Sequence, residues 1–431
     1  MFAACSSSGD DRREAAVYPH RAQCEPEGGE LSLRIATKFK WEIDGRYDWC
    51  RLSAYSGTGE MKITVSVDPY ETTDERVAAF DIRVGDTRLE AKVVQAGSGF
   101  VVTLGDASFS DYCLENFDLD GNGKLTADEA AQVEMIELWM TYPGAPVIRS
   151  LAGLEYFTGL TYLDCVDCRA LTQVDVTSNR NLEYLSFFGS RLTSLDLSCN
   201  PRLDYLNVSW NPLETLNLSA NPELRYLSCV KTQVTDMDLT ANNKLYEARF
   251  SGSKLKNVKF GEGTAIEMFY CDSCQVSGLD VSACTNLKTL DCTGNTMQEL
   301  DVARNTKLVA LICDGNRLSA LDVSHNPVLN SLTCSKNKLT SLSVAQNPVL
   351  RNLVCGDNLF ATLDVSANTG LRILDIDKSE IKQIDISKCT QLEIFFASED
   401  VKLQTVYVWP GFNLDDMRGY KVKAGVVFTE K

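Results

Sequence analysis

Apolar positions recur with a fixed period of 21 residues over more than half of this chain. Position 1 of each unit is almost always Leu, positions 4, 11 and 14 are mostly apolar, position 6 is usually Cys, and positions 9 and 19 are often Asn. A single unit of this kind cannot bury its apolar face, so the repeat predicts a solenoid of stacked turns. Units begin at Leu182, Leu203, Leu224, Leu245, Ile266, Leu287, Leu308, Leu329, Leu350, Leu371 and Leu392, and a looser unit of 22 residues begins at Leu160.

Each unit has two halves, which read LxxLxCxxN and LxxLxVxxN. Apolar residues spaced by two predict a short strand with one face inward, and the following Asn predicts a turn whose side chain bonds the backbone of the next coil. The unit resembles the leucine-rich repeat, LxxLxLxxNxL, in the 21-residue form of bacterial surface proteins. The resemblance covers about residues 147–410 and implies parallel strands along one side of a rod. Twelve rungs spaced by roughly 4.8 Å would make the rod about 55 Å long.

Residues 25–97 show a different pattern, with short alternating segments such as GGELSLRIATKFKWEI and RLEAKVVQAG between polar turns. This pattern predicts a small β-sandwich. The segment resembles the BACON domain of Bacteroidetes, a family implied to bind carbohydrate or to serve as a spacer. Trp41 and Trp49 are either sugar platforms or core residues, and we favour the core because small domains need large apolar side chains. The residues that carry the resemblance are Gly28-Gly29, Trp41, Trp49, Ser56-Gly57, Arg76 and the terminal VVQAG.

Residues 98–146 contain the sharpest chemical motif. FSDYCLENF and AAQVEMIELW predict two helices, and DLDGNGKLTADE between them matches the EF-hand loop D-x-[DN]-x-[DN]-G-x5-E. Hard oxygen ligands at this spacing suit Ca²⁺, and Gly123 stands where the loop turns sharply. We expect this helical segment to cap the solenoid at its N-terminal end and residues 411–431 to cap the other end. The predicted ligands are Asp118, Asp120, Asn122, the Lys124 carbonyl, Thr126 and both oxygens of Glu129.

The cysteines follow the repeat. Position 6 points inward, so we predict a ladder of buried, free thiols, since Cys is among the most buried residue types. Zinc at the pairs CVDC (165–168) and CDSC (271–274) is a weaker alternative, because no second ligand pair completes either site. Aspartates that recur at position 15 indicate a structural column. The position-6 cysteines are Cys165, Cys229, Cys271, Cys292, Cys313, Cys334 and Cys355.

The first residues, MFAAC, resemble the end of a bacterial lipoprotein signal. The resemblance implies that Cys5 carries a lipid and anchors the chain in the outer membrane, facing the cell surface, with residues 1–24 as a tether. The alternative is a disordered tail with an incidental cysteine.

Charge and composition exclude several functions. The net charge of −17 repels phosphate backbones, so we expect no nucleic-acid partner. The chain has only two histidines, His20 and His325, and no nucleophile–base arrangement or phosphate loop, so we predict that it is not an enzyme. The predicted function is adhesion or binding to an extracellular protein or glycan. The alternative is a structural spacer in an envelope complex.

Aromatic residues mark the expected binding face. Position 3 is tyrosine on four successive rungs and is predicted to point outward from the sheet. An exposed aromatic strip often marks a binding surface, although stacked tyrosines also stabilise neighbouring rungs. We therefore expect the ligand on the N-terminal half of the solenoid. The predicted ligand-binding residues are Tyr162, Tyr184, Phe188, Tyr205, Trp210, Tyr226 and Tyr270.

Overall fold

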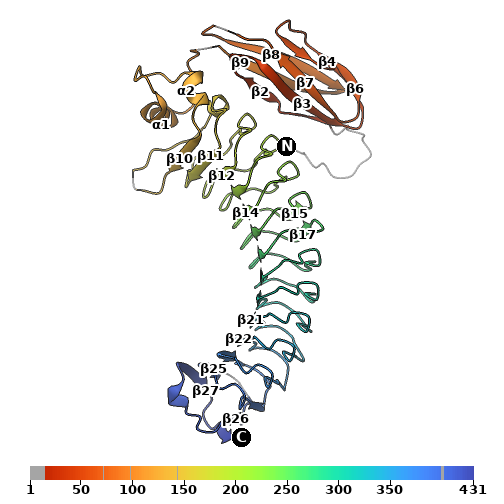
Figure 1. The fold of residues 1–431 in the computed structure, drawn as a ribbon, viewed down its shortest axis with the longest axis vertical. Helices are drawn as coiled ribbons and strands as arrows, with labels where there is room; N and C mark the ends of the chain where they lie inside the picture. Colours follow the sequence, from red (N-terminus) through yellow and green to blue (C-terminus); the bar gives the residue numbers. More distant parts are fainter. Residues whose placement is uncertain (1–14, 71, 98, 143, 399–401) are drawn as a thin grey trace. The chain divides into compact units, whose positions relative to one another are not determined.

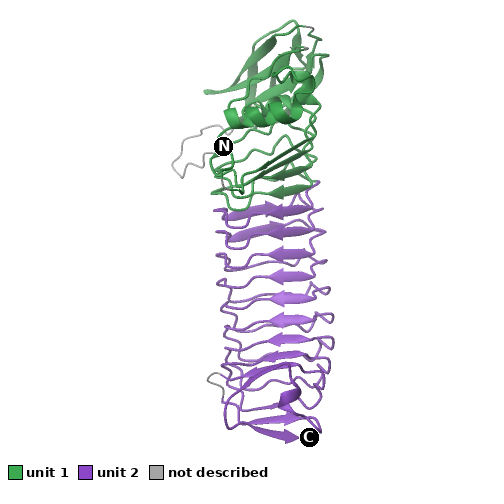
Figure 2. Cartoon of the chain, turned by 90° about the vertical axis from the view of Figure 1, so that its left-hand side faces the viewer, with its two compact units in different colours: residues 1–222 green, residues 223–431 purple. Residues whose placement is uncertain are grey.

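The computed structural model is mainly β and describes residues 15–70, 72–97, 99–142, 144–398 and 402–431. It divides into two compact units, Met1–Pro222 and Glu223–Lys431, which Figure 2 shows in green and purple. Cys5, the predicted lipid attachment site, lies outside the described residues.

The first unit begins with two sheets that share one buried core (Figure 1). The four-stranded sheet has the order β1-β3-β7-β5, and the five-stranded sheet has the order β2-β9-β8-β4-β6. β1 and β2 lie before residue 25, so residues 15–24 belong to the sheets and not to the expected tether. Val17, Ala22 and Cys24 explain this, because their side chains are buried in the core. The strands are β1 (Ala15–Tyr18), β2 (Arg21–Cys24), β3 (Gly29–Thr37), β4 (Lys40–Asp44), β5 (Cys50–Leu52), β6 (Ser56–Thr58), β7 (Met61–Val67), β8 (Glu75–Val84) and β9 (Thr87–Ala96).

The segment after the sheets contains α1 (Ala107–Phe117), α2 (Ala127–Ala131) and β10 (Met135–Trp139). α1 confirms the first predicted helix. The second prediction, one helix over AAQVEMIELW, is wrong: α2 ends early and β10 pairs in parallel with the first strand of the repeats. The physical reason is the alternation of MIELW, which buries Ile136 and Leu138 and exposes the residues between them.

The repeats form a parallel β-solenoid of about 13 turns, and the first half of the unit forms a short strand. In the first unit, η1 (Leu154–Tyr156) precedes β11 (Tyr162–Val166), β12 (Tyr184–Ser186) and β13 (Tyr205–Asn207). The second unit continues the pattern with β14 (Tyr226–Ser228), β16 (Glu247–Arg249), β18 (Met268–Tyr270), β19 (Thr289–Asp291), β20 (Ala310–Ile312), β21 (Ser331–Thr333), β22 (Asn352–Val354), β23 (Ile373–Asp375) and β25 (Ile394–Ala397).

The second half of the unit forms strands in only some turns. β15 (Asp236–Leu239) pairs with β17 (Asn257–Phe260), and β24 (Gln383–Asp385) pairs with β26 (Thr405–Val408). After η2 (Leu414–Asp416), β27 (Gly419–Val422) and β28 (Val427–Glu430) add parallel strands to β25 and β26. The C-terminal segment expected as a cap therefore extends both parallel ladders.

Asparagine side chains bond the backbone of a neighbouring turn, but it is the preceding turn and not the next one as predicted. At position 19, Nδ2 of Asn326 donates to the carbonyl oxygens of Val302 and Asn305, at 3.0 and 2.9 Å. At position 9, Nδ2 of Asn316 reaches the carbonyl of Cys292, 24 residues earlier, at 2.9 Å. These bonds satisfy backbone groups that burial would otherwise leave unpaired.

Candidate functional site

The tyrosines at position 3 stack along the sheet of the first unit. The parallel register aligns Met135 with Tyr162, Tyr184 and Tyr205. Ring centroids lie 4.1 Å apart for Tyr162 and Tyr184 and 4.3 Å apart for Tyr184 and Tyr205, with nearly parallel planes. All three side chains are half-buried. The contact between neighbouring rungs is therefore observed, while ligand binding by these rings stays a prediction.

Two predicted ligand-binding tyrosines lie in the second unit. Tyr226 begins β14, and Tyr270 ends β18. The guanidinium of Arg249 lies 4.6 Å from the centroid of the Tyr270 ring, and Arg249 also forms an ion pair with Glu247. Tyr270 is thus covered in part by a cation of its own chain.

Trp210 has an unusual backbone for its residue type. Its φ is 61°, in the left-handed region, and its side chain is 55% exposed. Every turn from Asp167 to Lys378 places position 8 in this region, but the other residues there are Asp, Lys, Ser or Gly. A bulky residue in that conformation costs about 1–2 kcal/mol, and such strain gathers at functional sites.

A groove of about 890 Å³ lies beside Trp210. Phe188 also lines it, so the structure brings together two of the aromatic residues that were predicted to bind a ligand. The groove is otherwise lined by Asp167, Arg169, Thr172, Gly189, Ser190, Arg191, Thr193 and Pro212. It therefore combines apolar rings with two arginines.

β10 adds residues to this sheet face that the sequence interpretation missed. Trp139 is 54% exposed, and its Nε1 donates to Oδ2 of Asp164 at 3.1 Å. Glu137 stands beside Asp164 in the register. One signal in the sequence could have indicated this strand, because MIELW alternates like the first repeat strand, YLDCV. The sequence interpretation placed a helix there instead.

The predicted calcium loop joins α1 to α2. Oδ1 of Asp118 accepts hydrogen bonds from the amides of Gly121 and Asn122, and Oδ2 accepts one from the amide of Gly123 at 2.7 Å. Gly123 has a φ of 78°, the conformation expected at the sharp turn. The segment thus folds back on the carboxylate of its first residue, which brings the acidic side chains together.

The donor set of this loop fits a hard cation. One carboxylate oxygen from each of Asp118, Asp120 and Glu129 lies within 4.8 Å of the others. Burial of Glu129 would raise the pKa of its carboxyl, but hydrogen bonds from Thr126 and from the Leu119 and Asp120 amides outweigh burial and lower that pKa. Glu129 is therefore ionised at neutral pH. Asn122, the Lys124 carbonyl and Thr126 are further oxygen donors of the loop, and their ligation of Ca²⁺ stays a prediction.

The described cysteines are free, and those at position 6 are buried, as predicted. The acidic loop is the one group of three or more potential metal ligands that converges in the described part of the chain. The CVDC and CDSC pairs therefore gain no further ligand there. The recurring aspartates are structural: Oδ1 of Asp322, for example, accepts the amide of Ser324 at 2.8 Å.

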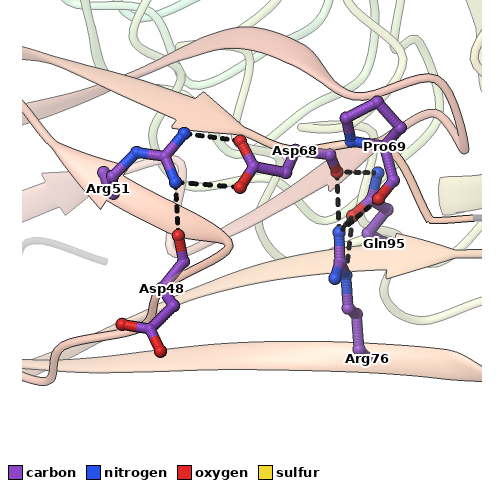
Figure 3. Close-up of polar contacts among 6 residues, drawn as sticks. All are labelled: Asp48, Arg51, Asp68, Pro69, Arg76 and Gln95. Atoms are coloured by element: carbon purple, nitrogen blue, oxygen red, sulfur yellow. Dashed lines mark hydrogen bonds and ion pairs between the residues drawn. The ribbon is translucent and has the colours of Figure 1, made fainter.

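The N-terminal sheets hold a partly buried polar cluster built from Arg76 and Gln95 (Figure 3). Arg76 donates to Oε1 of Gln95 at 2.6 Å and to the carbonyl of Asp68 at 2.6 Å, and Nε2 of Gln95 donates to that carbonyl at 3.0 Å. Arg76 also packs on the ring of Trp49. Trp41 is buried in the core, so of the two alternatives for Trp41 the structure supports the core residue.

Comparisons with known proteins match both parts of the chain. The model of the BACON family, "Putative binding domain, N-terminal", matches residues 39–96. No curated protein matches the chain. None of the helices in the described ranges has the length and apolar character to traverse a bilayer.

Three solved structures resemble the solenoid. The functional domain of InlJ from Listeria monocytogenes, which includes a cysteine ladder, matches at 26% identity with a TM-score of 0.64, covering 76% of this chain and 71% of that one. An internalin, inlF, from Listeria monocytogenes matches at 18% identity with a TM-score of 0.52, and the match covers 76% of this chain and 95% of that one. The leucine-rich repeat domain of APL1B matches at 18% identity with a TM-score of 0.50, and the match covers 71% of this chain and 90% of that one. These likenesses show a leucine-rich repeat fold.

Proposed function

We propose that this chain is a non-enzymatic surface protein that binds an extracellular protein through the sheet face and adjacent turns of its first repeats. The internalin-like fold and the BACON match support a role in protein binding or adhesion. The single observation that carries the location is Trp210, exposed and held in a left-handed conformation beside a groove. Aromatic anchors of this kind dominate many protein interfaces.

Calcium and lipid anchoring complete the proposal. Ca²⁺ bound by Asp118, Asp120 and Glu129 would hold α1 and α2 together. These helices precede β10, the strand that pairs with the first strand of the repeats. A lipid on Cys5 would anchor the chain in the outer membrane and present that face outside the cell. A glycan ligand is the alternative outcome for the same aromatic surface, because rings with polar edges suit sugars as well.

The test uses an array of extracellular proteins and glycans. Trp210→Gly removes the ring and relieves the left-handed backbone, so the variant should keep its melting temperature and lose most binding to the array ligand. The double variant Tyr205→Ala with Trp210→Ala should also weaken binding, whereas Thr333→Ala, in the second unit, should not. Normal binding by Trp210→Gly would show that the ligand binds elsewhere. If the wild type binds only glycans on the array, the ligand is a glycan and not a protein.

A further inference from the structure

A pocket of about 280 Å³ lies in the first unit, between the four-stranded sheet and the turns of the first repeats. The sheet contributes Tyr18, Arg34 and Lys62 to its lining, and the repeats contribute Arg180 and Cys199. Small-molecule sites are often found where two modules meet, and their usual volume is about 300–1,000 Å³. This pocket is at the lower end of that range, so it suits a small ligand.

The register of the sheet places two cations side by side in this pocket. Tyr18 of β1 lies opposite Arg34 of β3, and Arg34 lies opposite Lys62 of β7. Residues directly opposite in antiparallel strands point to the same face, and like charges in such a pair destabilise it. One acid offsets part of this charge, because Nε of Arg34 donates to Oε1 of Glu60 at 2.8 Å. The pair therefore keeps a positive charge that the sheet itself does not balance.

A third cation reaches the pocket from the repeats. Arg180 is half-buried, and neither Arg180 nor Lys62 forms an ion pair with a residue that the structure describes. Among the described residues that line the pocket, none is an acid. The whole chain carries a net charge of −17, so three cations around one pocket run against its composition. A concave site lined by one sign of charge concentrates ligands of the opposite sign.

Hydroxyl groups add further hydrogen-bond donors. Ser32 of β3 and Ser198 of the repeats line the pocket beside Tyr18. Burial raises the pKa of Tyr18, with Asp196 adding to the rise and Arg34 opposing it. The phenol therefore keeps its proton at neutral pH and can donate it to an anion. Guanidinium groups donate to two oxygens of a phosphate at once, and an ammonium group offers three donors.

We propose that this pocket binds a phosphate or sulfate group, either as the free ion or as an ester on a single sugar. Arg34, Lys62 and Arg180 neutralise the oxyanion, and the Tyr18 hydroxyl donates a hydrogen bond to it. The site is separate from the groove beside Trp210, so the inference goes beyond the proposed protein-binding function and does not depend on it.

Cys199 provides the readout, because its partly exposed thiol lines the pocket. The experiment measures the rate at which iodoacetamide alkylates Cys199 in the whole native protein, with phosphate, sulfate, glucose 6-phosphate or glucose 6-sulfate added. We expect the bound oxyanion to abolish most of this alkylation, while Cys274, a partly exposed thiol of the second unit, keeps its rate. Sodium chloride at matched ionic strength and plain glucose should protect neither thiol. Protection at lower concentration by the esters would identify a sugar ligand, and by the free ions an inorganic one.

Lys62→Gln and Arg180→Gln each remove one cation from the pocket. Each should raise the concentration needed for half-protection of Cys199 about tenfold, the loss of one charge-assisted hydrogen bond. Every variant is compared with itself without ligand, since Arg180 also acts on the Cys199 thiol. Lys38→Gln is the matched control, because Lys38 is an exposed cation of the same sheets outside the pocket.

Several results would overturn the proposal. Equal protection of Cys274, or protection by chloride or glucose, would show that the effect is not local to the pocket. Equal weakening by Lys38→Gln would show general attraction to cations of the surface. Absence of protection by all four oxyanions would leave the pocket without this ligand. None of these results bears on Trp210→Gly, which decides the proposed function alone.

Discussion

The thiols show how one residue type acquires different chemistry from its position in the turn. Burial raises the pKa of Cys284 and Cys389, at position 19, to about 12, and it raises the pKa of Cys313, at position 6, well above its usual value. A thiol with such a pKa is neutral at physiological pH and reacts slowly, since the thiolate is the nucleophile. Burial also raises the pKa of Cys199 and Cys274, but these two side chains are partly exposed and a reagent can reach them.

Alkylation of the native protein at pH 8 should therefore label Cys199 and Cys274 first and leave Cys292 and Cys313 unlabelled. The ladder thiols become accessible only when the solenoid opens, so their labelling follows unfolding. Peptide mass spectrometry measures the order, and the same reaction in denaturant should label every described cysteine. Labelling of Cys292 at the rate of Cys199 would contradict this.

The loop between α1 and α2 shows how the start of a helix can hold a predicted ligand in position. Thr126 caps α2 by accepting the Glu129 amide, and Glu129 in turn accepts the Thr126 amide at 2.8 Å. This reciprocal pair holds the Glu129 carboxylate beside Asp118 and Asp120. The helix start thus preorganises the predicted calcium ligand.

Calcium should raise the melting temperature of the wild type, and Glu129→Ala should abolish that rise. At a free concentration 100 times Kd, linkage gives about 2.7 kcal/mol of stabilisation. Glu129→Gln separates the two roles of the residue, because it keeps a capping acceptor and loses the charge.

Differential scanning calorimetry in excess Ca²⁺ and in chelator measures the effect, and Glu134→Ala, at a nearby exposed carboxylate, should respond like the wild type. Identical wild-type melting in both conditions would rule out the calcium site.

At the scale of the molecule, the first unit is held together by contacts from its sheets to its repeats. Nε2 of His20 lies 3.5 Å from Oδ2 of Asp175, Arg21 lies near Glu155, and Tyr156 donates to Glu75. The hydrogen bond to Asp175 raises the pKa of His20. Burial opposes ionisation of Asp175, but hydrogen bonds from His20 and Thr177 outweigh it and hold its pKa at about 2.

These shifts predict that the contact is strongest at mildly acidic pH. The His20 contribution is complete below the unfolded pKa of about 6.5 and is lost as pH rises through the raised folded value. The Asp175 contribution is present above its unfolded pKa of about 3.9 and is lost as pH falls towards 2.

Urea unfolding of wild type and His20→Gln should therefore differ more at pH 5.5 than at pH 8, by less than about 1 kcal/mol because the pair is exposed. His325→Gln is the control. An equal difference at both values of pH would contradict the assignment.

The repeat could be predicted from sequence because each turn needs the same residues at the same positions. The buried leucines, the inward thiols and the Asn bonds follow from that need alone. β10 could not be predicted in the same way: one copy of an alternating pattern next to a helix carries too little signal. Trp139 belongs to this sheet face only through that strand, so its place beside Asp164 could not be predicted from the sequence. The predicted ligands of the acidic loop, by contrast, are close in sequence, so their convergence could be expected without tertiary information.

The asparagine bonds have a consequence for how such a chain can change. The same two hydrogen bonds recur at position 19, where the side chain donates to carbonyls 24 and 21 residues earlier, in the preceding turn. This holds for Asn305, Asn326, Asn347 and Asn368. Removing or duplicating one whole turn therefore leaves every remaining bond with an equivalent partner. Unequal recombination within the gene would change the length of the solenoid one turn at a time, while the aromatic turns near its beginning keep their sequence and their neighbours.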